Sequence, residues 1–392
     1  MIRIRTITYN LPNDVSVVDM ERVRIACDLW KNGKYVCHTQ RMAFPPQTSD
    51  LDIASFAWTT DFCDKTGIRW FNIPVDPWGV TNLDSGLIVE LLGKYENAFC
   101  NIICTKDKYI DEKIIRYTTD AIKGVARIKA DGSANFRLGA SMNVAPNGPF
   151  FPFTYSNGKE LSFSIGLEIA EEINAIVGTC KDFQETRAAI NAALEPQFEE
   201  IQRIANDIAE KTGILYDGID FSLAPLPQDG NSVIAVLKAL GIQKMNGVGM
   251  MFGTAFLTDI LKGYARKYKS VGFSGVMYSL LEDCEYAQLN NNDTFSVDKM
   301  ISLSTMCGCG VDMVPVEYAI SDDAIRSIII EIGCISSKLN KPLGVRILPV
   351  IRSVNGYTDM KDDEDFIVNT KLVKVDSNTT CPLGEQFRFV SI

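Results

Sequence analysis

The sequence predicts an α/β fold, because short apolar stretches that suit strands alternate with amphipathic stretches that suit helices. Segments 71–75 and 98–104 are of the first kind, and segment 50–67 is of the second. The chain has 392 residues, of which 46% are hydrophobic and 22% charged, an ordinary globular balance that permits a sizeable core. That length suggests two or three structural units, unless one large α/β barrel takes most of the chain.

The amino-terminal third begins with a predicted strand at 1–9, where charged and apolar residues alternate in a way that does not resemble a signal peptide. Segment 50–67 has apolar residues at helical spacing, and Gly67 supplies the helix stop. The loop at 135–155 is punctuated by prolines, which fix its backbone and exclude a central strand.

The remainder of the chain repeats the alternation. Its predicted elements are a helix at 184–212, a strand from 214, an apolar strand or turn at 273–281, an apolar segment at 303–316, a helix at 322–338 and a strand at 343–350. Pro196 is expected to kink or divide the first helix, and Gly213 to end it. The residues after Asp359 include the acidic run 362–365 and are expected to form an exposed appendage.

Composition narrows the classes of function. A net charge of −10 argues against non-specific binding to nucleic acid or anionic membranes, although a local basic cluster could still bind an anionic substrate. No apolar run is long enough to span a membrane. Eleven cysteines without CxxC pairs favour reduced thiols in a cytoplasm. His38 is the only histidine, which excludes a His-rich zinc site and leaves open a carboxylate site for a divalent cation.

The loop 135–155 carries the first candidate binding residues. Arg137, Asn143 and Asn147 stand among small and aromatic residues, which suits an apolar pocket with a few precise hydrogen bonds. A purely structural turn is the alternative.

Glu282 and Asp283 follow an apolar stretch, where α/β proteins place ligand-binding groups. Adjacent carboxylates repel each other, which raises one pKa and suits a general acid or base. The alternative is a helix N-terminus stabilised by the helix dipole.

Cys307 and Cys309 are separated and followed by glycines, which let the backbone approach a ligand. Turn amides can lower a thiol pKa, so Cys307 is either a nucleophile or part of a pocket lining. A Cys–His dyad would require His38.

Arg346 lies in an apolar strand, so its charge must meet a carboxylate of the protein or of a ligand. With Arg137 it forms the predicted pair of anion-binding residues, because guanidinium groups bind carboxylates bidentately. The segment 352–357 is one residue away from a glycyl-radical signature, but its spacing argues against a radical at Gly356. Nucleotide-binding glycine motifs are absent.

The combination of these segments resembles an uncharacterised family, domain of unknown function 711, also called uncharacterised protein family 0210. The matching segments are 135–137, 143–144, 149–152, 165–168, 220–225, 231–233, 272–275, 282–283, 307, 310–313 and 345–349. Members are similar to pyruvate formate-lyase in fold, with an α/β barrel of about ten strands, and lack its radical chemistry. The sequence departs from the family pattern in 316–322 and after 354.

The resemblance implies one large α/β barrel at 1–358, with helices outside, and a polar C-terminal extension at 359–392. We expect an enzyme that acts on a small, anionic, carboxylate-bearing metabolite by acid–base, lyase or hydrolase chemistry; the alternative is a metabolite-binding or regulatory protein without turnover. The residues expected to bind substrate are Asn135, Arg137, Asn143, Asp220, Asp312 and Arg346. We also expect the protein to be cytoplasmic, to form a homo-oligomer and to lack a glycyl radical.

Overall fold

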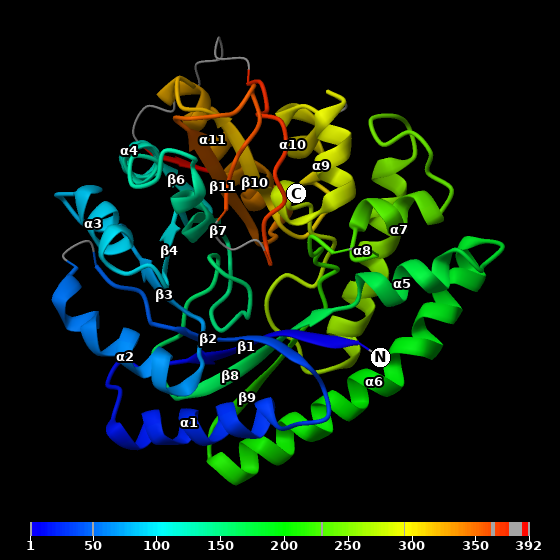
Figure 1. Ribbon diagram of the computed structural model, residues 1–392, viewed down its shortest axis with the longest axis horizontal. Coiled ribbons are helices and arrows are strands. Elements are labelled where there is room, and N and C mark those ends of the chain that lie inside the picture. Colours follow the sequence, from blue (N-terminus) through cyan, green and yellow to red (C-terminus); the bar gives the residue numbers. More distant parts are fainter. Residues whose placement is uncertain are drawn as a thin grey trace.

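The computed structural model describes residues 2–48, 51–228, 230–293, 295–361, 365–375 and 386–390. The first half contains β1 (Arg3–Asn10), α1 (Val17–Lys31), β2 (Cys37–Ala43), η1 (Ile53–Phe56), α2 (Ala57–Thr66), β3 (Trp70–Val75), α3 (Gly86–Lys94), β4 (Ala98–Ile103), β5 (Thr105–Lys106), β6 (Tyr109–Asp111), α4 (Glu112–Val125), η2 (Ser133–Arg137) and β7 (Leu138–Met142). The second half contains β8 (Ser162–Glu168), α5 (Ala170–Val177), α6 (Phe183–Thr212), β9 (Leu215–Asp220), α7 (Val233–Ala239), α8 (Met250–Lys267), η3 (Leu280–Glu282), α9 (Cys284–Asn291), α10 (Val297–Leu303), β10 (Gly310–Glu317), α11 (Asp322–Leu339), β11 (Leu343–Val350) and β12 (Gln386–Arg388). The predicted α/β architecture is confirmed (Figure 1).

Nine strands form one sheet, in the order β10-β11-β7-β4-β3-β2-β1-β8-β9. The sheet contains three groups of parallel strands. The largest group consists of β1, β2, β3, β4 and β7, and the other two are β8 with β9 and β10 with β11. The pairs β1–β8 and β11–β7 are antiparallel. The sheet therefore consists of parallel groups that run in opposite directions and meet at two antiparallel seams.

Segment 270–279 contacts both edges of this sheet. It makes isolated parallel bridges to the β9 side, through Ile219 with Ser270 and Leu223 with Val276, and to β10, through Ser279 with Asp312. Ser274 has a φ of 45°, which interrupts strand geometry. The described part of the chain does not contain the expected closed barrel of about ten regular strands. It contains a nine-stranded sheet, and both edges of this sheet contact the irregular segment 270–279. The apolar strand or turn predicted at 273–281 is an irregular segment with isolated bridges, and its end forms η3.

The loop between β7 and β8 lies among the strands (Figure 1). Glycines in the strands make room for its aromatic rings: a Cβ atom on Gly344 of β11 would lie 2.5 Å from Phe153, and one on Gly166 of β8 would lie 3.1 Å from Phe150. The aromatic part of the loop therefore fills space beside these strands. The expectation that 135–155 excludes a central strand is wrong for its first part, because residues 138–142 form β7 between β11 and β4, and the prolines come only after this strand.

The predicted helix boundaries follow from local capping. Helix α6 starts at the N-cap Asp182, ends at Gly213 in the left-handed conformation, and continues through Pro196 as one helix. Helix α2 ends at Gly67, also left-handed, as predicted. Helix α11 and strand β11 lie within one residue of their predicted ranges.

Part of the C-terminal extension is buried, contrary to the expectation of an exposed appendage. Phe366, Ile367, Leu372 and Val373 are at most 8% exposed, and they pack against the two halves of the chain. Their apolar side chains outweigh the polarity of the segment around them. Most of the acidic run, residues 362–364, lies outside the described residues.

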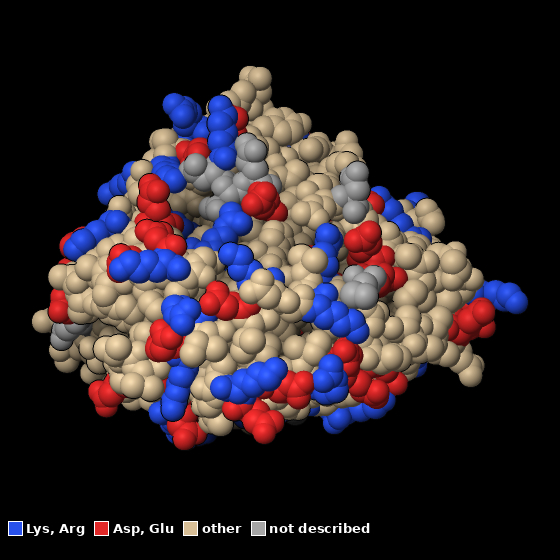
Figure 2. Space-filling model, turned by 60° about the horizontal axis from the view of Figure 1, so that its bottom comes forward, with Lys and Arg blue, Asp and Glu red and all other residues tan. Residues whose placement is uncertain are grey.

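The face turned forward in Figure 2 carries interspersed basic and acidic side chains. Helices α1 and α6 contribute such pairs, including Arg24 with Glu21 and Arg203 with Glu200. Exposed ion pairs of this kind contribute little to stability. In the described part of the chain, no helix is long and apolar enough to cross a membrane.

Candidate functional site

A small cavity lies between the two halves of the chain. Its volume of about 30 Å³ has room for one or two water molecules. Its walls combine aromatic rings with charged groups: Arg5, Arg41, Trp70, Phe99, Phe136, Phe150, Phe151, Phe153, Ala224, Met277, Ser279, Glu282, Cys309, Asp312, Arg346 and Phe366. Charged side chains in an aromatic cavity are the polar groups that fix a ligand's orientation in typical small-molecule sites.

Arg346 on β11 is the most extensively bonded charge in this cavity. It donates to both carboxylate oxygens of Asp312, at 2.7 and 2.9 Å, and to the carbonyl of Phe136 at 3.2 Å. Burial raises the pKa of Asp312, although Arg346 opposes that shift. Burial also disfavours the charged form of Arg346, but Asp312 and Glu282 outweigh this effect and raise its pKa. The pair is therefore held rigidly by two parallel hydrogen bonds.

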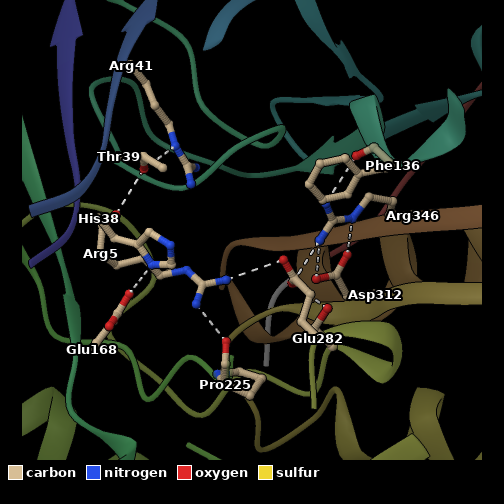
Figure 3. A network of polar contacts seen from close by, with 11 residues as sticks. Arg5, His38, Thr39, Arg41, Phe136, Glu168, Pro225, Glu282, Asp312 and Arg346 are labelled. Atoms are coloured by element: carbon tan, nitrogen blue, oxygen red, sulfur yellow. Dashed lines mark hydrogen bonds and ion pairs between the residues drawn. The ribbon is translucent and has the colours of Figure 1, made fainter. Parts of the chain in front are cut away.

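Glu282 lies between two arginines, as Figure 3 shows. Its Oε1 accepts from Arg5 at 3.3 Å, and its Oε2 accepts from Arg346 at 3.2 Å and from the Ser279 hydroxyl at 2.5 Å. Charge-assisted bonds to arginine are usually 2.7–2.9 Å long, so both guanidinium contacts are loose. Oε1 is the oxygen of this carboxylate that is held least tightly.

Arg41 on β2 has no carboxylate partner among the described residues. Its Nε donates to the Thr39 hydroxyl at 3.0 Å, and its guanidinium lies over Trp70 at 4.9 Å and over Phe151 at 5.2 Å. It is 4% exposed and points toward the space beside Arg5 and Glu282 (Figure 3). Burial, followed by repulsion from Arg5, lowers its pKa, and the charge of Glu282, which forms no ion pair with it, opposes this shift.

The cavity therefore has an excess of positive charge. Three guanidinium groups, those of Arg5, Arg41 and Arg346, face the two carboxylates of Glu282 and Asp312. All five side chains are buried. Because a buried charge without a counter-charge is costly, this arrangement favours the entry of one small anion.

Arg137, the second predicted anion binder, points away from this cavity. It donates to the backbone carbonyls of Leu92, Tyr95 and Ala98 at 2.8–3.2 Å. These carbonyls lie at and beyond the end of α3, where helix geometry leaves acceptors unsatisfied. The structure gives Arg137 a role in holding α3 against β4.

The predicted amide residues also bind the chain itself. The Asn135 side chain donates to the carbonyl of Ile122 at 3.0 Å, and the Asn143 side chain donates to the Ser336 hydroxyl at 3.0 Å. Asn147 accepts from the backbone of Asn157. Asn135 thereby holds η2 against α4, Asn143 holds the start of the β7–β8 loop against α11, and Asn147 closes this loop on itself.

Asp220 joins β9 to segment 270–279. Its carboxylate accepts from the backbone amides of Phe273 and Ser274 at 2.8 and 2.9 Å, and from Ser222. Burial raises its pKa, and these hydrogen bonds oppose the shift. Asp220 does not line the cavity.

Asp283 lies beside Glu282 in sequence but caps a helix. Its carboxylate accepts from the backbone amides of Glu285 and Tyr286 in α9 and of Val233 in α7. Asp283 is the N-cap of α9, as in the alternative interpretation of the sequence, a carboxylate at a helix N-terminus. Burial raises the pKa of Asp283 to about 6, and the hydrogen bonds oppose that shift.

Asp283 should make stability depend on pH. Its folded pKa lies above the ordinary value of 3.8, so its favourable contribution is present below about pH 4 and is lost as the pH rises through about 6. This shift corresponds to a loss on the order of 3 kcal/mol. Asp283→Asn should flatten the curve of unfolding free energy between pH 4 and 6.5, measured by urea denaturation. Parallel curves for the two proteins would contradict the assignment.

Cys309, not Cys307, lines the cavity. Both thiols are buried, and the Cys309 sulfur accepts from the backbone amide of Tyr278 at 3.1 Å. A hydrogen bond from Cys309, aided by Lys341, lowers the pKa of Cys307 to about 6. Cys307 is buried but is not part of the cavity wall.

Arg5, Arg41 and Phe366 were missed by the sequence analysis. Arg346 stands in an apolar strand, whereas Arg5 lies in a segment where charged and apolar residues alternate and Arg41 in a segment of mixed polarity, so their burial was not signalled. No comparable signal marks Phe366, a single aromatic residue that follows an acidic run.

His38, the only histidine, binds Glu168 through Nδ1 at 2.9 Å and stacks on Phe366. Across the described residues, no group of three or more His, Cys, Asp or Glu side chains is placed to hold a metal ion.

Relatives of this chain match much of it at low identity. A UPF0210 protein of Sulfurisphaera tokodaii is 29% identical over 245 residues, covering 61% of this chain and 55% of that protein. One of Pyrobaculum arsenaticum is 28% identical over 243 residues, covering 59% and 53%. UPF0210 protein MK1214 of Methanopyrus kandleri is 25% identical over 281 residues, covering 69% and 62%. The chain thus spans just over half the length of the first two relatives.

A family model, described as Uncharacterised ACR (DUF711), matches residues 79–359, which include Glu282, Asp312 and Arg346. Because this match covers well over half of the chain, the protein belongs to the DUF711 family.

Proposed function

We propose that the cavity binds a small carboxylate-bearing metabolite and that the protein is an enzyme that performs acid–base chemistry of the lyase or hydrolase type on it. The single observation that carries this proposal is Arg41, a buried guanidinium that faces a cavity without a carboxylate partner among the described residues. A ligand carboxylate at Arg41 would supply the missing counter-charge.

In this proposal Glu282 moves the proton. Asp312 is held bidentately by Arg346, whereas Glu282 Oε1 has one long contact, to Arg5. The looser oxygen can reach a ligand bound at Arg41 and take a proton from it. Ser279, which donates to Oε2, would orient the carboxylate. Positioned bases of this kind contribute about 10²–10⁴-fold to a rate.

The proposed fold is a single barrel resembling that of pyruvate formate-lyase, in which segment 270–279 acts as the tenth strand. Its bridges to both edges of the sheet support this proposal. A radical at Gly356 is not part of the proposal, because this residue lies in a turn and does not line the cavity. Free thiols at the described cysteines support a cytoplasmic location.

A thermal-shift screen of small carboxylates tests binding, because a ligand at 100 times its Kd stabilises a protein by about 2.7 kcal/mol. Arg41→Met should weaken binding of any carboxylate found by about 10- to 100-fold, since a charge-assisted bond is lost. Arg22→Met, a change on the exposed part of α1, is the matched control and should leave affinity unchanged. Equal weakening by both changes would contradict a site at Arg41.

Glu282→Gln distinguishes an enzyme from a binding protein. An enzyme should keep its affinity within a few-fold and lose turnover by about 10²–10⁴-fold. If turnover survives this change, Glu282 is not the base. If the ligand binds the unaltered protein without conversion, the alternative of a metabolite-binding or regulatory protein is correct.

A further inference from the structure

Phe366 connects the cavity wall with residues of an open groove. Its ring forms part of the cavity wall and stacks on His38, at 4.9 Å between ring centres. His38 and Arg69, which both contact the ring, line an open groove of about 750 Å³. With Phe366 in place, the cavity volume of about 30 Å³ is too small for a metabolite, since ligand pockets usually measure about 300–1,000 Å³.

The position of this ring has the properties of a binding site for an aromatic group. The guanidinium groups of Arg5 and Arg69 lie 5.3 and 5.0 Å from the ring centre, and Trp70 meets it edge to face at 5.0 Å. Cations and perpendicular rings at these distances stabilise any planar aromatic group in the same way.

Within the described part of the chain, Phe366 contacts the protein through its ring. The preceding residue, Asp365, forms one ion pair with Arg69 at 3.2 Å, and its carboxylate is 67% exposed. Exposed pairs contribute about 0–1 kcal/mol. Among the described backbone hydrogen bonds, the first beyond Phe366 is the one from Val368 to Leu281, at 2.7 Å. Val368 is fixed by this bond, so displacement of the Phe366 ring would move Phe366 and the buried Ile367 and leave the segment from Val368 onward in place.

Trp70 connects this position with Arg41. The Arg41 guanidinium lies 4.9 Å from the Trp70 ring, and the Phe366 ring lies 5.0 Å from it. A ligand with a carboxylate at Arg41 and a ring in place of Phe366 would therefore lie across Trp70, with a short linker between the two groups.

We propose that the ligand is an arylcarboxylate whose ring takes the place of Phe366 and displaces this side chain toward the groove. The inference rests on the proposed function, because the carboxylate is placed at Arg41. Phe366 thereby keeps the charged cavity closed until a ligand with an aromatic group enters.

Calorimetric binding of 3-phenylpropionate and acetate to the full chain tests the inference. Phe366→Ala removes the competing ring and should tighten 3-phenylpropionate binding at least tenfold, with acetate binding unchanged. Phe366→Leu retains an apolar plug and is the control, with affinities close to those of the unaltered protein. Equal or weaker binding of 3-phenylpropionate to Phe366→Ala would overturn the inference.

A second measurement, ¹⁹F NMR, keeps an aromatic ring at position 366. With 4-fluorophenylalanine at position 366, addition of 3-phenylpropionate should move the ¹⁹F resonance to a solvent-exposed position, whereas acetate should not. An unmoved resonance in the bound state overturns the displacement of Phe366. The two proposals fail differently: Arg41-dependent binding without any effect of Phe366 removes only the aryl site, and absence of carboxylate binding to all variants removes both.

Discussion

Arg346→Met should lower the free energy of unfolding by about 3–5 kcal/mol, because it leaves Asp312 and Glu282 as buried carboxylates without their main cation. The change also removes the donor that satisfies the Phe136 carbonyl. Urea denaturation of the purified variant measures the loss. A methionine of similar length fills the space, so the expected loss comes from the charges and not from a void.

The control for this prediction is a second change on β10. Arg346→Met combined with Asp312→Asn removes one of the two stranded charges and should recover part of the lost stability. If the single variant loses less than about 1 kcal/mol, the buried network is not ionised in the way its geometry indicates.

Arg41→Met should have the opposite sign and raise the free energy of unfolding by about 1–3 kcal/mol, because a buried cation without a carboxylate partner in the described structure is replaced by an apolar side chain. Loss of the contacts with Trp70 and Phe151 offsets part of this gain. Thermal and urea unfolding measure it in the absence of carboxylates. A gain in stability together with a loss of binding is the behaviour of a residue kept for function.

Arg41→Lys is the control for this second prediction. It keeps the positive charge in the cavity and should therefore give no stabilisation. If Arg41→Met is instead destabilising, the guanidinium makes a net favourable contribution in the closed cavity, which would contradict an anion site at Arg41.

The sequence by itself determined the features that depend on neighbouring residues. The ends of α2 and α6 follow from Gly67, Gly213 and Asp182, whose caps act within one turn. The extent of α11 and β11 follows from apolar periodicity in the same way. The charge of Arg346 inside an apolar strand also predicted a carboxylate partner, and in the structure this partner is Asp312.

Only the tertiary structure decided which charged residues meet. Arg137 and Arg346 were both predicted to bind an anion, yet one binds carbonyls near α3 and the other binds carboxylates in the cavity. Neither Arg137, in η2, nor the two cysteines before β10 lie in a regular strand, so no local period indicates their direction. Cys309 reaches the cavity and Cys307 does not.

The cavity itself joins segments that are far apart in the chain. Arg5 and Glu282 are 277 residues apart, and Phe366 comes from a segment whose local composition is polar. No local pattern encodes such contacts, because the topology of the sheet and the burial of single apolar side chains determine them. The sequence thus determined the elements and several of the charges, and the packing of the two halves determined the site.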